Sequence, residues 1–220
     1  MGRPQDNGGQ RHKKRKSFLY SFAKVLAWVL FHTVYPVKVH GREHLNLQGP
    51  CIVIANHLSG LDPVCIAHAA KGEEITFLAK KELMKSRFSD WLLRTLHAIP
   101  VDRHNSDMSA MRACMQALKD GRVLGIFPEG TRYTKGNMEE LEGGVAILAL
   151  RSQVPVIPAY IHGKLRPFCL VHVYARPPME IGDLLEIGAG KEAGDMLLSR
   201  IADLYKEFAR KAEERREISL

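Results

Sequence analysis

Residues 51–63 read Cys-Ile-Val-Ile-Ala-Asn-His-Leu-Ser-Gly-Leu-Asp-Pro, which is an apolar run followed by a polar turn. The run 51–55 has the length and β-branched content of a strand. Gly60 permits a loop, and Asp62-Pro63 is typical of a helix start, with Asp62 at the N-cap and Pro63 at the first helical position. The stretch therefore predicts a strand–loop–helix unit.

The same alternation continues outward from this unit. The predicted strands are 37–40, 51–55, 75–79, 99–101, 123–127, 154–160 and 169–174. The predicted helices are 63–70, 89–96, 109–119, 144–152 and 195–216, the last with a buried stripe of Leu197, Ile201, Leu204 and Phe208. Strands that alternate with helices predict an α/β fold. We expect a single domain over residues 37–220, with a central, mostly parallel sheet flanked by helices.

The positive charge of the chain is concentrated at its amino end. The net charge is +8, and residues 1–40 hold eight Lys or Arg against one acid, which leaves 24 basic and 23 acidic residues in the remainder. Residues 1–17, with the run Arg-His-Lys-Lys-Arg-Lys at 11–16, are predicted to form a basic disordered tail. A solubilising tail is the competing interpretation, because charge runs are usually solvated.

Residues 18–36 are apolar almost throughout and predict a helix. A signal peptide would need a cleavage site that is not recognisable here, and a spanning helix would carry the penalty of Lys24. A helix that lies in the membrane interface accommodates Lys24, which can extend to the headgroups, and Trp28 at the boundary. A helix buried against this domain or a partner is the remaining alternative. We expect the interfacial helix.

An apolar helix beside five basic residues supplies the two signals that stable membrane anchoring requires. The expected partner is an anionic membrane surface, and the expected location is the cytoplasmic face of the cell membrane, peripheral or monotopic. No nucleic acid is expected as a partner, because the near-neutral body lacks a basic face. The four cysteines form no C-x-x-C pair and are predicted to be reduced, partly buried small hydrophobes.

His57 and Asp62 are the first candidates for chemistry. On a helix, five residues would place them on different faces, so they can meet only across a loop. A carboxylate that accepts a hydrogen bond from one imidazole nitrogen would leave the other nitrogen available as a base. From spacing alone, a helix cap and an ordinary loop histidine explain these two residues equally well.

Cationic residues follow several predicted strands, and in a parallel sheet those ends share one edge. Lys80 and Lys81 follow one strand, Arg103 follows 99–101, and Arg132 ends the turn 127–132, Phe-Pro-Glu-Gly-Thr-Arg. Each alone is typical of a solvated surface. Together with His57 they indicate an anionic substrate that carries a hydroxyl group.

Four blocks in this order resemble the glycerolipid acyltransferase family, in particular bacterial 1-acyl-sn-glycerol-3-phosphate acyltransferases. They are Asn56-His57-x4-Asp62, residues 99–103, the six residues 127–132, and Val-Pro-Val-Ile-Pro at 154–158. The resemblance covers residues 40–180. It implies transfer of a fatty acyl group from acyl-CoA or acyl-carrier protein to lysophosphatidic acid, which yields phosphatidic acid in phospholipid biosynthesis.

The resemblance also implies roles for individual residues. His57 would be the general base and Asp62 would orient it, whereas substrate binding would fall to Lys80, Arg103, Glu129, Gly130, Thr131 and Arg132. No acyl-enzyme is implied, in agreement with the absence of a G-x-S-x-G motif, and neither a metal nor a cofactor is implied. Another lysolipid as acceptor, or a lipid-binding scaffold without activity, are the alternatives.

Overall fold

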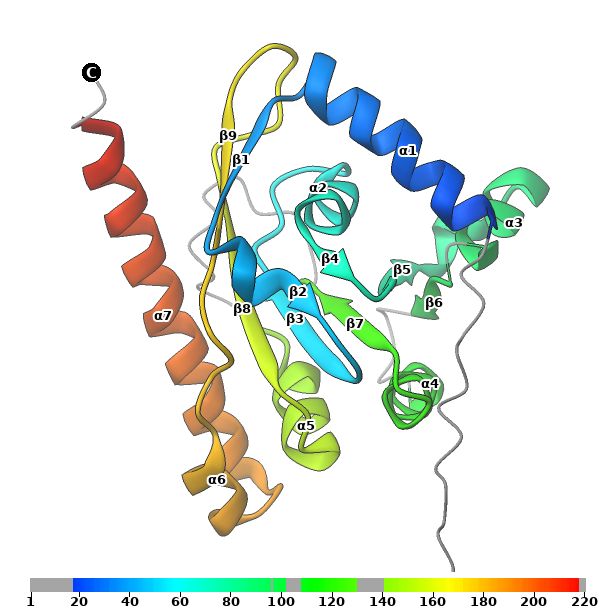
Figure 1. Ribbon diagram of the computed structural model, residues 1–220. Helices are drawn as coiled ribbons and strands as arrows, with labels where there is room; N and C mark the ends of the chain where they lie inside the picture. The colour runs from blue at the N-terminus through cyan, green and yellow to red at the C-terminus, as the bar shows by residue number, and fades with distance from the viewer. Residues whose placement is uncertain (1–17, 96, 102–107, 130–140, 218–220) are drawn as a thin grey trace, which may run out of the picture.

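The computed structural model describes residues 18–95, 97–101, 108–129 and 141–217. A seven-stranded sheet with the order β1-β9-β8-β3-β7-β5-β6 forms the centre of the molecule (Figure 1). Its strands are β1 (Val37–His40), β3 (Cys51–Ala55), β5 (Ile75–Lys80), β6 (Ile99–Val101), β7 (Val123–Ile126), β8 (Val156–His162) and β9 (Val171–Ala175).

All neighbouring strands in this sheet pair in parallel except β8 and β9, so the mostly parallel sheet is confirmed. The parallel group β8-β3-β7-β5-β6 therefore has its carboxyl ends at one edge. A separate short ladder pairs β2 (Asn46–Leu47) with β4 (Lys71–Gly72). Neither of these two-residue strands was predicted.

Helices cover both faces of the sheet (Figure 1). They are α1 (Phe18–Thr33), α2 (Asp62–Ala69), α3 (Arg87–Thr95), α4 (Met108–Lys119), α5 (Gly143–Ser152), α6 (Gly182–Ile187) and α7 (Lys191–Glu217), with short 3-10 turns at Arg42–Leu45 and Lys81–Met84. The five helices predicted after residue 37 are all present. The short α6 was missed.

The alternation of side chains along β3 divides the core into two layers. Ile52 and Ile54 pack with α4, α5 and α7 on one face, whereas Cys51, Val53 and Ala55 pack with α2 on the other. All five β3 residues are buried, as expected for a central strand covered on both faces. The segment directly after β3 is therefore held from both sides.

Several boundaries differ from the sequence prediction for identifiable reasons. The strand predicted at 154–160 is Val156–His162, because its antiparallel pairing with β9 continues to His162, which lies opposite His172. The stripe of α7 contains fully buried Tyr205 where Leu204 was predicted, and Leu204 is only half-buried. Among the cysteines, Cys51, Cys65 and Cys114 are buried, whereas Cys169 is exposed.

Candidate active site

His57 lies directly after the carboxyl end of β3, and its imidazole meets the Asp62 carboxylate. The distance from His57 Nδ1 to Asp62 Oδ2 is 2.9 Å. The residue is only 9% exposed, and its ring stacks on Phe127 with a centroid distance of 4.4 Å. The structure thus brings together the two residues that the sequence placed on either side of a loop.

The Asp62 carboxylate is buried and accepts four hydrogen bonds. In addition to its contact with the imidazole, Oδ2 accepts hydrogen bonds from the backbone N–H groups of Leu58 and Ser59. Oδ1 accepts a hydrogen bond from the Ser59 hydroxyl at 2.8 Å. Carboxylate oxygens accept hydrogen bonds, and each of these loop groups supplies a donor to them. Asp62 therefore organises the whole 57–62 loop around the imidazole.

Asp62 was predicted at the N-cap of the following helix, and this prediction is wrong by one position. Asp62 is the first residue of α2, and Leu61 is the N-cap. The reason is that the carboxylate turns back toward the N–H groups of the preceding loop instead of capping the first turn of its own helix. The helix start still fixes the carboxylate, because it belongs to the rigid element.

Glu129 closes the loop from the opposite side. It lies beyond the end of β7, is 4% exposed, and its Oε2 accepts the backbone N–H of His57 at 3.0 Å. The sequence resemblance implied that Glu129 binds substrate. In the structure its carboxylate contacts the main chain of the residue expected to act as the base.

Two further residues support this loop, and their roles were not recognised in the sequence. Asn56 is fully buried and joins the end of β3 to β8 through its two hydrogen bonds with Ile161, at 2.9 and 2.7 Å. The Tyr205 hydroxyl of α7 lies 2.8 Å from the carbonyl oxygen of Ile54 and 2.7 Å from that of Ala159. Burial, followed by the nearby Glu129 charge, raises the pKa of Tyr205 well above its usual value. It therefore remains a neutral donor.

The remaining predicted site residues lie at the same edge of the sheet or outside the described residues. Lys80 ends β5, and its Nζ lies 3.6 Å from Glu82 Oε1. Arg103, Gly130, Thr131 and Arg132 lie outside the described residues, as does the tail 1–17. Arg103 and Arg132 follow β6 and β7 by two and six residues, at strand ends that lie on the His57 edge.

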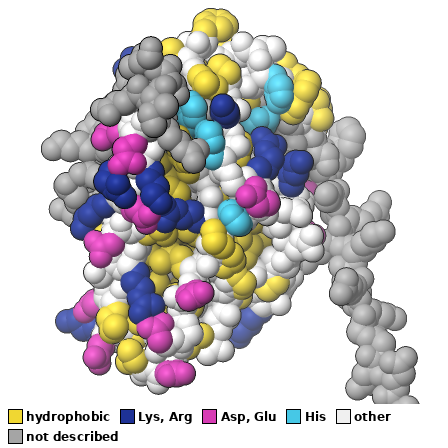
Figure 2. Space-filling view, turned by 60° about the vertical axis from the view of Figure 1, so that its left-hand side comes forward, with side chains coloured by type: hydrophobic (Ala, Val, Ile, Leu, Met, Phe, Trp, Pro, Cys, Tyr) yellow, Lys and Arg dark blue, Asp and Glu magenta, His cyan; other side chains and the backbone are white. Residues whose placement is uncertain are grey.

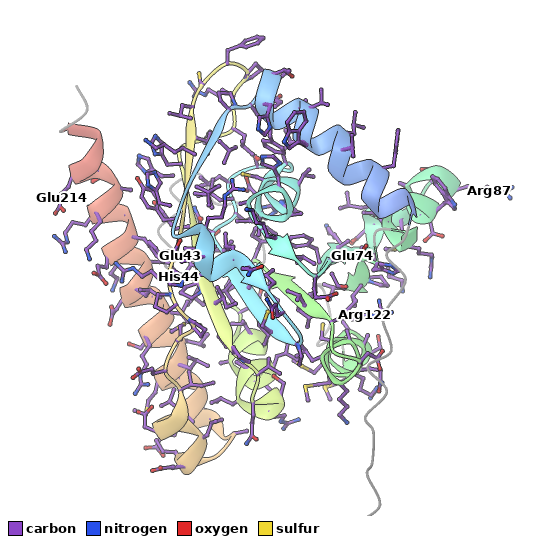
Figure 3. The ribbon with its side chains drawn as sticks, in the orientation of Figure 1. Glu43, His44, Glu74, Arg87, Arg122 and Glu214 are labelled. Carbon is purple, nitrogen blue, oxygen red and sulfur yellow. The ribbon has the colours of Figure 1, made fainter. Side chains whose placement is uncertain are left out.

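The opposite edge of these strands carries a different set of charges. Figure 3 labels Glu74 and Arg122, which directly precede β5 and β7. His97, whose Nε2 lies 3.8 Å from Glu74 Oε2, has a positive φ of 58°. In the part of the chain that the structure describes, no three His, Cys, Asp or Glu side chains group as metal ligands would.

Comparisons with known proteins identify the family of the chain. The acyltransferase family model matches residues 36–162, more than half of the chain. The 1-acyl-sn-glycerol-3-phosphate acyltransferase of Bacillus subtilis is 29% identical over 145 residues, which cover 66% of this chain and 72% of that protein. The enzyme of Streptococcus pneumoniae is 32% identical over 165 residues, which cover 74% of this chain and 61% of the relative.

Human 1-acyl-sn-glycerol-3-phosphate acyltransferase alpha is 33% identical over 155 residues, covering 66% of this chain and 54% of the human protein. The chain thus spans less than two thirds of the Streptococcus and human relatives. Among solved structures, the 1-acyl-sn-glycerophosphate acyltransferase PlsC of Thermotoga maritima superimposes with a TM-score of 0.68 at 26% identity, covering 89% of this chain and 78% of that one. The family predicted from the four sequence blocks is confirmed, and the chain belongs to the acyltransferase family.

Proposed function

We propose that this protein transfers a fatty acyl group from a thioester to the free hydroxyl of 1-acyl-glycerol-3-phosphate. The single observation that carries the proposal is the contact of 2.9 Å between His57 Nδ1 and the buried Asp62 carboxylate. The acceptor is supported by the names of the relatives from Bacillus, Streptococcus and human. The donor is acyl-CoA or acyl-carrier protein.

The hydrogen bonding of His57 supports a role as the general base. The bonds seen for this residue among the described residues use Nδ1 and the main-chain N–H, so Nε2 is left for the substrate. Nε2 takes the proton of the acceptor hydroxyl as its oxygen attacks the thioester carbonyl. The new C–O bond forms and the C–S bond breaks. His57 then returns its proton to the leaving sulfur, so the donor departs as a thiol. Asp62 fixes the tautomer of the neutral imidazole and stabilises the imidazolium that forms transiently.

The acceptor phosphate is bound at the carboxyl edge of the parallel strands. Lys80 is placed there by β5, and Arg103 and Arg132 follow the neighbouring β6 and β7. One guanidinium group can donate two parallel hydrogen bonds to a phosphate, which supports a phosphate-binding role for both arginines. Glu129, Gly130 and Thr131 belong to the turn that shapes this site, with Glu129 holding the His57 main chain.

The protein is proposed to work on a membrane surface, where its amphiphilic acceptor resides. The stripe Phe22, Val25, Leu26 and Val29 on α1 is exposed, whereas Phe31 faces inward and stacks on His68 of α2 at 5.0 Å. An apolar stripe on the outer side of a surface helix is what an interfacial helix requires. Within the described residues, the structure contains no helix with the length and apolar character needed to span a bilayer.

The reaction is tested by incubating the purified protein with lysophosphatidic acid and either acyl donor, followed by mass analysis of the lipid. Phosphatidic acid is the expected product, and His57→Ala should lower turnover by about 10²–10⁴-fold. His44→Ala is a matched control, because His44 is a half-buried histidine on a 3-10 turn outside the site. Near-normal turnover of His57→Ala would exclude the mechanism. Acylation of phosphate-free lysolipids alone would exclude the proposed acceptor.

A further inference from the structure

The loop between β8 and β9, residues 163–170, exposes large apolar side chains beside α1. Phe168 is 78% exposed and Leu170 is 54% exposed. Isolated exposed apolar residues are ordinary in proteins, but here two occur within three positions, close to the exposed stripe of α1. Hydrophobic side chains also gather along the upper end of the molecule in Figure 2.

Main-chain hydrogen bonds fasten this loop to the end of α1. The N–H of Phe168 donates to the carbonyl oxygen of Val34 at 2.6 Å, and the N–H of Val171 donates to that of Pro36 at 2.9 Å. Figure 1 shows the loop next to the carboxyl end of α1 at the top of the molecule. The loop is therefore fixed to the segment that directly follows α1.

The conformation of the loop holds the aromatic ring outward. Phe168 has a φ of 61°, a left-handed conformation that bulky side chains rarely adopt. A third hydrogen bond, from the N–H of Cys169 to the carbonyl oxygen of Arg166 at 3.2 Å, closes the turn. A strained residue that presents its apolar side chain to water indicates a binding function.

The charge of the loop identifies the partner. Residues 163–170 read Gly-Lys-Leu-Arg-Pro-Phe-Cys-Leu, with exposed Lys164 and Arg166 and no acidic residue. Cations next to inserted apolar side chains match the anionic headgroups and the acyl boundary of a bilayer. An apolar protein partner would not require two cations at the rim.

We infer that the 163–170 loop is a second membrane contact, in which Phe168 and Leu170 insert into an anionic bilayer beside α1 while Lys164 and Arg166 bind its headgroups. This inference rests on the proposed membrane-surface function. It adds a second point of contact to α1, and two separate points fix the orientation of the molecule on the surface.

Cys169 provides a natural reporter, because it lies between the two inserting residues. It is exposed, whereas Cys51, Cys65 and Cys114 are buried, and burial raises the pKa of their thiols to about 11, 12 and 11 respectively. A membrane-impermeant maleimide should therefore label Cys169 in the folded protein. The labelling rate is measured with and without vesicles that contain anionic phospholipid, together with the fraction of protein that sediments with them.

The expected result is a labelling rate about tenfold lower on anionic vesicles and a smaller decrease with purely zwitterionic vesicles, which lack the attraction for Lys164 and Arg166. An unchanged rate for protein that does sediment would overturn the second contact while leaving α1 as the anchor. Absence of sedimentation would overturn both the second contact and the membrane-surface part of the proposed function. Acyl transfer is measured separately with a short-chain, monomeric lysophosphatidic acid.

Substitution gives an independent test. The double variant Phe168→Ser, Leu170→Ser should lower vesicle partitioning by about tenfold or more, since two large apolar side chains no longer transfer from water. Ile187→Ser, Met196→Ser is the matched control, because these residues are 49% and 40% exposed on α6 and α7, away from α1. Equal partitioning of both double variants would contradict the inference. A loss of self-association by the Phe168→Ser, Leu170→Ser variant with unchanged vesicle partitioning would also contradict the inference, because it would assign the surface to contact with a second copy of the chain.

Discussion

At the scale of single residues, two carboxylates with different tasks hold His57. Asp62 contacts the imidazole and the loop N–H groups, whereas Glu129 contacts the His57 main chain. One therefore sets the tautomer of the ring, and the other sets the position of the residue that carries it. Glu129 is in this respect a positioning residue.

Truncation of Glu129 should separate these tasks. Glu129→Ala removes the acceptor for the His57 N–H and should lower kcat about 10–100-fold with a smaller change in the KM for lysophosphatidic acid, because a displaced base loses proton-transfer geometry. Glu129→Gln retains a carbonyl acceptor and should recover most of kcat. Steady-state kinetics of both variants test this. An effect on the KM alone would instead assign Glu129 to phosphate recognition.

Sequence reasoning reached the contact between His57 and Asp62 but not the support around it. A histidine, a glycine and an aspartate at this spacing allow a loop contact, although spacing alone did not distinguish it from a helix cap beside an ordinary loop histidine. The Asn56 link to Ile161 spans 105 positions and the Tyr205 link to Ile54 spans 151. Such partners are decided by sheet order and helix packing, for which the sequence carries no local signal.

At the scale of elements, the strands and longer helices were predictable because their apolar residues form runs or recur at the spacing typical of a strand or a helix. The two-residue strands β2 and β4 and the six-residue α6 were missed, since such short elements produce no period. The strand predicted at 169–174 begins at Val171, because the preceding residues are held in the loop that binds the end of α1.

The role of α7 can be tested at its central tyrosine. Tyr205→Phe removes the hydroxyl that lies against the ends of β3 and β8. It should lower the free energy of unfolding by about 1–2 kcal/mol, because a buried hydrogen bond is lost and its carbonyl acceptor is left without that donor. Urea unfolding measures this change.

Tyr160→Phe is the control for this experiment. Tyr160 is also buried, its ring centroid lies 6.1 Å from that of Tyr205, and its hydroxyl makes no hydrogen bond with another described residue. Burial, followed by the charges of Glu213 and Glu129, raises its pKa to about 12, so both tyrosines are neutral at pH 7. Similar losses for the two variants would show that packing, and not the Tyr205 hydrogen bonds, is responsible.

At the scale of the whole molecule, the charge distribution separates a nearly neutral body from a basic amino-terminal segment. Residues 1–40 carry seven of the eight net charges, and the remainder is close to neutral. Attraction to anionic lipid is about 1 kcal/mol for each basic residue near the surface and is screened by salt. The amino-terminal segment should therefore determine how binding responds to ionic strength.

Removal of residues 1–17 should weaken binding to anionic vesicles by at least about tenfold and flatten its dependence on salt. Binding to zwitterionic vesicles should change little, because the apolar stripe of α1 remains. Vesicle sedimentation between low and high salt measures both effects. If the shortened protein retained the full salt dependence, the basic run would be only a solubilising tail.

The short helix α2 has a consequence for how surface binding and chemistry are linked. Asp62 begins this helix, and six residues later His68 stacks against Phe31 of α1. Six helical residues span about 9 Å, so a rigid rod of that length connects the carboxylate to the helix that would rest among the lipids. Tilting of α1 on a curved or poorly packed leaflet would then be transmitted to the proton acceptor, and catalytic rate would vary with membrane curvature even at saturating substrate.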